Sequence, residues 1–287
     1  MVEALPFDAA PAGQERRLGR VGQKGFDGLR VWLTGASTGI GAALADPLVR
    51  RGARVAITAR RSDLLDAIVT MQARGGASPV LAVPADVTDR EAVTAAARRI
   101  EAAWGGIDLA VFNAGGSIGA NPGQPTGALD RQFDASDYTA TMTLNYFSVV
   151  HGIDAVLPGM LARGSGHIAA VASLAGYRPV PPAAAYGASK AAVIHLLDAL
   201  RFHLEPRGVR VTVINPGFVR TPLTSRNTFK MPFLLEADDA AERIVRGLER
   251  GKMEIHFPAP LSWTMKLLRI VPYTLYAQVI KRMTPRE

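Results

Sequence analysis

The stretch VWLTGASTGIGAAL, residues 31–44, predicts a strand, a glycine-rich turn and a helix in immediate succession. Gly35, Gly39 and Gly41 permit backbone angles and close approach by a ligand that a side chain would prevent. The backbone N–H groups at the start of the following helix suit a pyrophosphate. Glycine-rich turns also form simple tight corners, but the position at a strand–helix junction favours a dinucleotide site.

The same alternation of short apolar runs and amphipathic stretches continues along the chain. The early runs are nearly continuous in apolar residues, which is typical of strands buried on both faces. We predict strands at residues 30–33, 54–58, 80–83, 109–112, 166–172, 209–214 and 253–257, and helices at 40–51, 90–104 and 237–250. Repeated β-α-β units predict an α/β fold: one doubly wound, Rossmann-like parallel sheet of about seven strands with helices on both faces.

Composition narrows the possible functions. The 287 residues are 48% hydrophobic and 20% charged, which suits a globular core. There is no cysteine, so disulfides, thiolate catalysis and cysteine-based zinc sites are excluded. The net charge is +8, but lysine and arginine are scattered, which favours a basic surface with one anion site over nucleic-acid binding. The five histidines show no ligand spacing, and we predict no metal.

We expect one Rossmann-fold domain over residues 28–258, between an arm at residues 1–27 and an amphipathic extension at residues 259–287. The arm is rich in Gly, Pro and charge and lacks the apolar segment of a signal peptide, so we expect it to be flexible. No apolar run approaches the ~18 residues of a spanning helix. We therefore expect a cytoplasmic protein.

The stretch AYGASKAAVIHLLDAL places Tyr186 four residues before Lys190 at the start of a predicted helix. The two side chains are thus neighbours one turn apart. Taken alone they could be a surface pair. A phenol has an ordinary pKa of ~10, and a nearby cation favours its ionised form. The pair therefore suits the proton transfer that must accompany hydride transfer at a carbonyl.

The pattern T-G-x-x-x-G-x-G followed by Y-x-x-x-K resembles the classical short-chain dehydrogenase/reductase (SDR) family, over about residues 28–257. The resemblance implies that Tyr186 is the general acid/base and that Ser173 binds the substrate oxygen. It also implies that Lys190 binds the nicotinamide ribose and that Asn145 positions a water linking Lys190 to solvent. The family pairs the helices around Asn145 and Lys190 between subunits, so a homodimer or homotetramer is expected.

The resemblance also implies a set of cofactor contacts. Asp86 would accept from the adenine amino group, and Val87 would pack on the ring. Phe112 replaces the first Asn of the family's N-N-A-G stretch. The residues expected to contact the cofactor are Gly35, Ser37, Thr38, Gly39, Ile40, Gly41, Arg60, Arg61, Asp86, Val87, Asn113, Ala114, Gly115, Tyr186, Lys190, Pro216, Gly217, Val219 and Thr221.

The end of the second predicted strand bears on the choice of cofactor. Ala59 stands where NAD-preferring members commonly carry an acid, and Arg60 and Arg61 follow it. A guanidinium can hold a 2′-phosphate bidentately, which favours NADP(H) over NAD(H). The alternative is that both arginines only solvate a helix start. Thr38 stands where some members place a second basic residue, so Arg60 is expected to be the main determinant.

Two segments bear on the substrate and on partners. Residues 220–236 are rich in apolar side chains and follow the cofactor segment as a lid would, so a hydrophobic alcohol or ketone is expected, with ordinary core contact as the alternative. Residues 116–127 and 174–182 are expected to form the other walls. The extension has two amphipathic segments broken at Pro272, with Tyr273, Tyr276, Ile280 and Met283 on one face and with Lys266, Arg269, Lys281 and Arg282 making it basic. Covering its own domain or a partner subunit is favoured, and an anionic membrane surface is the alternative.

The sequence thus predicts an NADP(H)-dependent oxidoreductase that interconverts a secondary alcohol and a ketone or aldehyde, on a hydrophobic small molecule. One alternative is a reductase of a 3-oxoacyl group or long-chain ketone at a membrane surface. Another is a non-catalytic NADP(H)-binding regulator with the same fold, against which the complete set Asn145, Ser173, Tyr186 and Lys190 argues.

Overall fold

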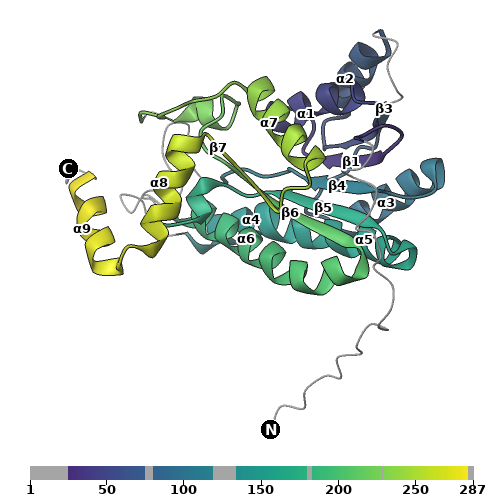
Figure 1. Cartoon of the computed structure of the whole chain (residues 1–287). Coiled ribbons are helices and arrows are strands. Elements are labelled where there is room, and N and C mark those ends of the chain that lie inside the picture. Colours follow the sequence, from purple (N-terminus) through teal and green to yellow (C-terminus); the bar gives the residue numbers. More distant parts are fainter. Residues whose placement is uncertain (1–24, 75–79, 119–133, 180–182, 228, 284–287) are drawn as a thin grey trace.

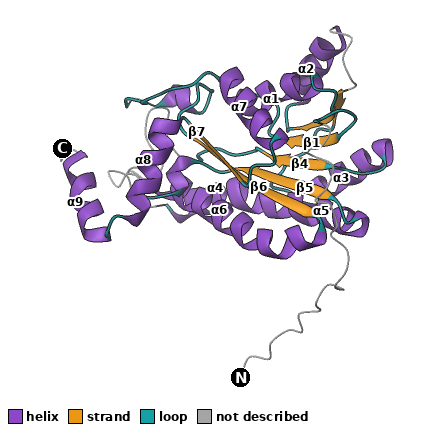
Figure 2. Cartoon of the chain, viewed as in Figure 1, coloured by secondary structure: helices purple, strands orange, loops and turns teal. Residues whose placement is uncertain are grey.

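The computed structural model describes residues 25–74, 80–118, 134–179, 183–227 and 229–283. These residues form a seven-stranded parallel sheet in the order β3-β2-β1-β4-β5-β6-β7, with helices on both faces (Figures 1 and 2). This confirms the predicted doubly wound α/β fold. Most of the expected N-terminal arm, residues 1–24, lies outside the described residues.

The element bounds follow the sequence pattern closely. The strands are β1 Arg30–Thr34, β2 Arg54–Thr58, β3 Val80–Ala82, β4 Leu109–Phe112, β5 Gly166–Val171, β6 Val209–Pro216 and β7 Glu254–Phe257. The α-helices are α1 Gly39–Val49, α2 Ser62–Arg74, α3 Arg90–Trp104, α4 Ala135–Met142, α5 Ser148–Arg163, α6 Ala184–Leu204, α7 Ala237–Glu249, α8 Ala259–Ile270 and α9 Tyr273–Met283. A π-helical turn, Thr143–Phe147, joins α4 to α5. Every strand and helix predicted above ends within two residues of its observed bounds.

Two apolar layers sandwich the sheet. Successive residues of a strand point to opposite faces, so Leu33 enters the layer covered by α1 and α7, while Trp32 enters the layer covered by α3, α5 and α6. Both side chains are fully buried. Burying one such side chain contributes about 1.5–3 kcal/mol. Packing on both faces holds the sheet in place, and the sheet in turn positions the loops that leave its carboxyl edge.

Local signals explain why α3 matches its prediction. Asp89 caps its first turn by accepting from the backbone N–H groups of Glu91 and Ala92. Gly105 ends it in the left-handed conformation, with φ of 78°. The extension breaks at Pro272 as expected, between α8 and α9. No helix in the described part of the chain combines the length and apolar character needed to cross a bilayer.

A buried histidine lies in the centre of the sheet. The Nε2 atom of His167 is 2.8 Å from Thr212 Oγ1, and that hydroxyl donates to the carbonyl of Lys252 at 2.7 Å. The single hydroxyl proton is therefore committed, so His167 Nε2 must carry the proton of the shared hydrogen bond. The Nδ1 atom has no partner among the described residues. Burial, and then the charge of Arg210, lower the pKa of His167 to about 3.

This histidine makes stability depend on pH. Between pH 6.5 and about 3, the unfolded chain binds a proton at His167 that the folded chain does not bind. The free energy of unfolding should therefore fall as pH drops through this window, by up to about 1.4 kcal/mol per pH unit from this residue. Above pH 6.5 the contribution is complete. Urea unfolding at a series of pH values measures this free energy. It should depend less steeply on pH in His167→Gln, because glutamine keeps a donor for Thr212 but does not titrate.

The exposed His195 provides the matched control. The variant His195→Gln should keep the pH dependence of the wild type. If His167→Gln also keeps the wild-type slope, His167 does not carry the linked proton.

Candidate active site

A cavity of about 470 Å³ opens at the carboxyl edge of the sheet, among the loops that follow β1 to β6. It spans the point between β1 and β4 where the strand order reverses, which is where open α/β sheets bind ligands. Of the residues expected at the site, those that line the cavity are Gly35, Ser37, Thr38, Gly39, Ile40, Arg60, Arg61, Val87, Asn113, Ala114, Gly115, Ser173, Tyr186, Lys190, Pro216, Gly217, Val219 and Thr221. Gly41, Asp86 and Asn145 do not line it.

The glycine-rich loop leaves room that side chains would fill. Gly35 and Gly39 have left-handed backbones, with φ of 68° and 60°. A Cβ atom on Gly41 would lie 2.1 Å from the carbonyl oxygen of Gly35, so this glycine lets α1 pack against the end of β1. The Thr38 side chain does not cap α1. The first N–H groups of the helix are therefore left for another acceptor, as in an anion site.

Asn113 holds this loop in place. Its Nδ2 atom donates to the carbonyls of Thr34, at 3.3 Å, and Gly35, at 3.1 Å. The hydroxyl of Thr34 accepts in return from the backbone N–H groups of Asn113 and Ala114, at 3.1 and 3.3 Å. The ends of β1 and β4 are thus tied together. Asn113 was expected to contact the cofactor. It lines the cavity, and its side-chain amide donates to the backbone at the end of β1.

Phe112, which replaces the family's first Asn, belongs to the core. Its ring meets Trp32 edge to face, with ring centroids 6.0 Å apart. A Cβ atom on Gly152 of α5 would lie 2.2 Å from the ring, so this glycine makes room for the larger side chain. The replacement therefore changes the packing behind the loop, while the hydrogen bonds of Asn113 remain.

Ser173 and Tyr186 meet inside the cavity. Ser173 follows β5 and its hydroxyl accepts from the backbone N–H of Ala175 at 3.1 Å, while Tyr186 lies in the first turn of α6. Both side chains line the cavity. Burial raises the pKa of Tyr186 above 10, and the hydrogen bond with Ser173 offsets part of this rise. The phenol is therefore protonated at neutral pH and can act as a proton donor.

The ammonium of Lys190 is buried beside this pair. Its Nζ atom donates to the carbonyl of Val171 at 2.8 Å and lies 5.8 Å from the centroid of the Tyr186 ring. Burial lowers the pKa of Lys190 to about 8. We expected the nearby cation to favour the ionised form of Tyr186. In the structure, burial is the largest effect on the pKa of Tyr186, and it favours the protonated form.

Asn145 lies behind the cavity wall, in the π-helical turn. Its Oδ1 atom accepts from the backbone N–H of Gly116 at 2.7 Å, and its Nδ2 atom donates to the carbonyl of Gly116 and the hydroxyl of Ser189, both at 2.8 Å. Single π-turns are frequent at functional sites because they redirect one side chain. Here the turn directs Asn145 so that it joins the loop after β4 to α6.

The two arginines after β2 have different neighbours. Arg60 is 75% exposed and its Nη1 atom lies 3.8 Å from Asp86 Oδ2, whereas Arg61 donates to the hydroxyl of Ser37 in the glycine-rich loop at 3.1 Å. The other oxygen of Asp86 accepts from Thr88. Burial raises the pKa of Asp86, but the hydrogen bonds from Thr88 and the charge of Arg60 outweigh it, so the net shift is downward. Asp86 is therefore ionised at neutral pH.

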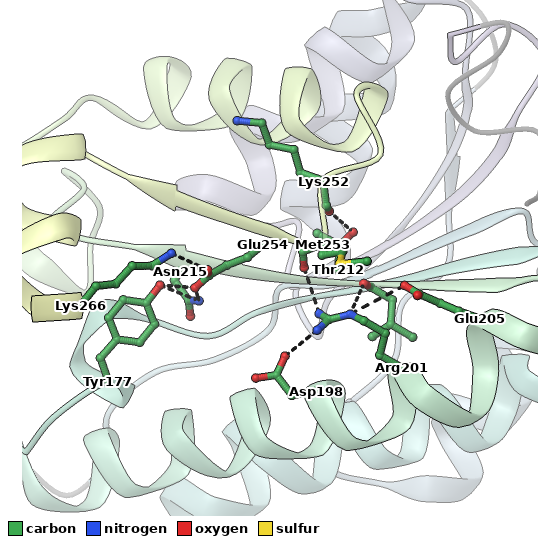
Figure 3. Close-up of polar contacts among 11 residues, drawn as sticks. Tyr177, Asp198, Arg201, Glu205, Thr212, Asn215, Lys252, Met253, Glu254 and Lys266 are labelled. Carbon is green, nitrogen blue, oxygen red and sulfur yellow. Dashed lines mark hydrogen bonds and ion pairs between the residues drawn. The ribbon is translucent and has the colours of Figure 1, made fainter. Parts of the chain in front are cut away.

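Sequence reasoning missed a polar cluster that supports the wall (Figure 3). One carboxylate oxygen of Glu254 accepts from Tyr177 and, at 3.0 Å, from Asn215, and its other oxygen pairs with Lys266 at 2.6 Å. Burial raises the pKa of Glu254. The hydrogen bonds from Lys266 and Tyr177 outweigh this effect, so the net shift of the pKa is downward and the carboxylate is charged. The cluster ties α8 to β6, β7 and the turn after Ser173. These residues are too far apart in the chain to form a recognisable motif.

The extension also packs against the site. A Cβ atom on Gly217, which lines the cavity, would lie 3.0 Å from both Leu261 and Pro258, so the start of α8 contacts this wall. Thr221 lies close to Gly39, so the segment after β6 reaches the glycine-rich loop. Parts of the other expected walls, residues 119–127 and 180–182, lie outside the described residues.

Comparison with known proteins agrees with this geometry. The family model for short chain dehydrogenases matches residues 30–231. An uncharacterized oxidoreductase from Myxococcus xanthus is 38% identical over 251 residues, which cover 88% of this chain and 96% of that protein.

Two solved structures share the fold. A short chain dehydrogenase from Burkholderia cenocepacia, in complex with NADP, is 29% identical with a TM-score of 0.75, covering 91% of this chain and 100% of that one. A short chain dehydrogenase/reductase from Burkholderia phymatum, in complex with NAD, is 24% identical with a TM-score of 0.75, covering 91% and 98%. The motif resemblance therefore extends to the whole domain, and this chain belongs to the short-chain dehydrogenase/reductase family of oxidoreductases.

Proposed function

We propose that the protein uses NADP(H) to interconvert a secondary alcohol and a ketone or aldehyde, with Tyr186 as the general acid/base. The observation that carries this proposal is the placement of Tyr186, Ser173 and Lys190 in one cavity with the glycine-rich loop. A proton donor, a hydroxyl that can bind a carbonyl oxygen and a cation are thus combined with a cradle for a dinucleotide. These are the groups that carbonyl reduction requires.

The residues present fit a dinucleotide. Gly35 and Gly39 keep the loop open to close approach, and the uncapped start of α1 offers N–H groups to a pyrophosphate. Arg60 and Arg61 line the same cavity where a 2′-phosphate would need a cation. When bound, the nicotinamide supplies or accepts the hydride. Both NADP and NAD occur in solved members of the family, so the preference rests on these two arginines.

In the reductive direction, the hydroxyl of Ser173 donates to the carbonyl oxygen and orients it. Tyr186 then transfers its phenolic proton to this oxygen while the carbonyl carbon gains the hydride. The positive charge of Lys190 stabilises the phenolate that remains, because both groups lie in a region of low dielectric. Solvent then restores the proton to Tyr186. Asn145 supports this step by holding the loop at Gly116 and the helix α6 at Ser189 in place.

The remaining lining supports an uncharged, apolar substrate. Leu144, Val171, Pro222 and Leu223 contribute apolar surface to the cavity. Among the described residues that line it, the cations are Arg60, Arg61 and Lys190. All three are assigned to the cofactor and the proton transfer. A substrate carboxylate would therefore lack a dedicated partner in this part of the site.

The variant Tyr186→Phe tests the acid/base role. Removing the phenolic proton donor should lower kcat/KM for ketone reduction by about 10²–10⁴-fold, while NADPH affinity changes little. The measurement is NADPH oxidation against a panel of aliphatic, cyclic and aromatic ketones, with NADPH binding followed by fluorescence. Tyr146→Phe, a tyrosine that does not line the cavity, is the matched control and should keep wild-type turnover.

Wild-type turnover in Tyr186→Phe would contradict the mechanism. NADPH binding by the wild type with no turnover of any carbonyl or alcohol would instead favour a non-catalytic regulator.

The pKa of Lys190 predicts the alkaline side of the pH profile. Burial lowers this pKa from 10.5 to about 8, so the positive charge is present below pH 8 and lost as pH rises through it. Above that point kcat/KM for ketone reduction should fall, approaching about tenfold per pH unit. Initial rates across this range test it. A profile that stays level well above pH 8 would exclude Lys190 as the controlling group.

The arginines after β2 should set the cofactor preference. In Arg60→Ala and in Arg61→Ala, the KM for NADPH should rise by roughly tenfold or more, because a charge-assisted contact with the 2′-phosphate is lost. The KM for NADH should change little. Arg50→Ala, which removes an exposed arginine paired with Asp46 on α1, serves as control and should affect neither. Equal effects on both cofactors would show that the arginines do not read the 2′-phosphate.

A further inference from the structure

The corner between α8 and α9 exposes a group of large apolar side chains. Leu267 is 61% exposed, Ile270 77%, Tyr273 71% and Leu275 54%. With Pro272 they surround the turn that joins the two helices, and we call these five residues the apolar corner. Figure 1 shows α8 beside β7 and α9 outermost at the same end of the molecule. Tyr273 and Tyr276 were expected on one face of the second segment; Tyr276 is buried, whereas Tyr273 is exposed.

The α8 helix is apolar on two faces. Leu261 and Met265 pack inward against the core. Trp263, Leu267 and Ile270, spaced four and three residues apart, form a second stripe that faces outward, with Trp263 62% exposed. A surface helix normally turns one polar face to solvent, and a helix that is apolar on both sides is normally covered on both. The outward stripe and the apolar corner therefore need an occupant.

The charge around the corner indicates which occupant fits. Residues 255–286 contain no Asp or Glu. The basic residues of α8 and α9 are Lys266, which pairs with Glu254 of β7, and Arg269, Lys281 and Arg282. Aromatic side chains such as Trp263 and Tyr273, which combine an apolar body with a polar tip, suit the boundary between lipid and water. Apolar, aromatic and basic groups without acids match the surface of an anionic bilayer.

A second copy of the chain fits less well. A two-fold dimer through this corner would place the same surface against itself. Two surfaces whose helices carry basic residues and no acids would then face each other. Anionic lipid head groups provide the opposite charge. We propose that the apolar corner docks this protein on the surface of an anionic membrane, with its side chains inserted at the head-group level.

The corner is held firmly enough to act as a docking element. Arg178 donates to the carbonyl of Val271 at 2.8 Å, and its guanidinium lies 4.5 Å from the centroid of the Tyr276 ring. Lys266 anchors α8 to Glu254 of β7. With 12 and 11 residues, α8 and α9 are too short to cross a bilayer and would lie on its surface. The cavity wall at Gly217 is contacted by the same helix α8, so docking would fix the site relative to the lipid.

The test is sedimentation of the full chain with vesicles, which does not depend on the proposed reaction. The wild type should pellet with vesicles of phosphatidylcholine and phosphatidylserine, less with phosphatidylcholine alone, and less at high salt. The double variant Leu267→Glu/Ile270→Glu should lose at least about tenfold in partitioning, because two apolar contacts are removed and negative charge is added. Both positions are exposed, so the fold should persist, which circular dichroism checks.

Met71→Glu is the matched control, because Met71 is 58% exposed on α2 and lies outside both the apolar corner and the helices expected to pair between subunits. It should pellet like the wild type. Wild-type protein that stays in the supernatant with both kinds of vesicle would overturn the proposal, as would equal pelleting of the double variant. A third outcome is that the wild type does not bind vesicles and that light scattering shows a changed oligomeric state in the double variant alone. The corner would then be a subunit interface, and the membrane proposal would be wrong.

Discussion

The buried ammonium of Lys190 constrains the structure around it. A charge removed from water needs a hydrogen-bond acceptor, and the carbonyl of Val171 at the end of β5 provides one. Space is needed as well: a Cβ atom on Gly115 would come within 2.9 Å of both Lys190 Nζ and Asn145 Oδ1. Asn145 in turn depends on the π-turn that directs it toward Gly116 and Ser189. The backbone after β4, the π-turn and α6 are therefore built around one cation.

The parallel sheet explains why so many distant residues meet at this point. In a parallel sheet all carboxyl ends lie on one edge, so the loops after β1 to β6 converge there. The loops bring different groups to the cavity: the glycine-rich turn after β1, two guanidinium groups after β2, Asn113 after β4, the Ser173 hydroxyl after β5 and, after β6, a segment that reaches Gly39. The extension adds to this arrangement from outside, because Glu254 links Lys266 of α8 to Asn215 beside the cavity wall.

Sequence could predict the features that depend on local pattern. Apolar runs placed the strands, and Asp89 and Gly105 bounded α3 because caps act over a few residues. Motif spacing singled out Tyr186 and Lys190, and both line the cavity. What the sequence could not supply depends on contacts made far along the chain. The structural partners of Asn113, the cluster around Glu254 and the rise in the pKa of Tyr186 all require tertiary burial. The oligomeric state remains a prediction.

The central claim is that the site transfers a hydride between a nicotinamide and a carbonyl carbon while Tyr186 supplies the proton. Isotope transfer tests it most directly. The enzyme would be incubated with NADPH deuterated at the nicotinamide C4 and a ketone that it turns over, and the alcohol would be analysed by mass spectrometry. The account predicts deuterium on the carbinol carbon of the product. An alcohol without deuterium from either C4 position, formed while NADPH is consumed, would contradict direct hydride transfer at this site.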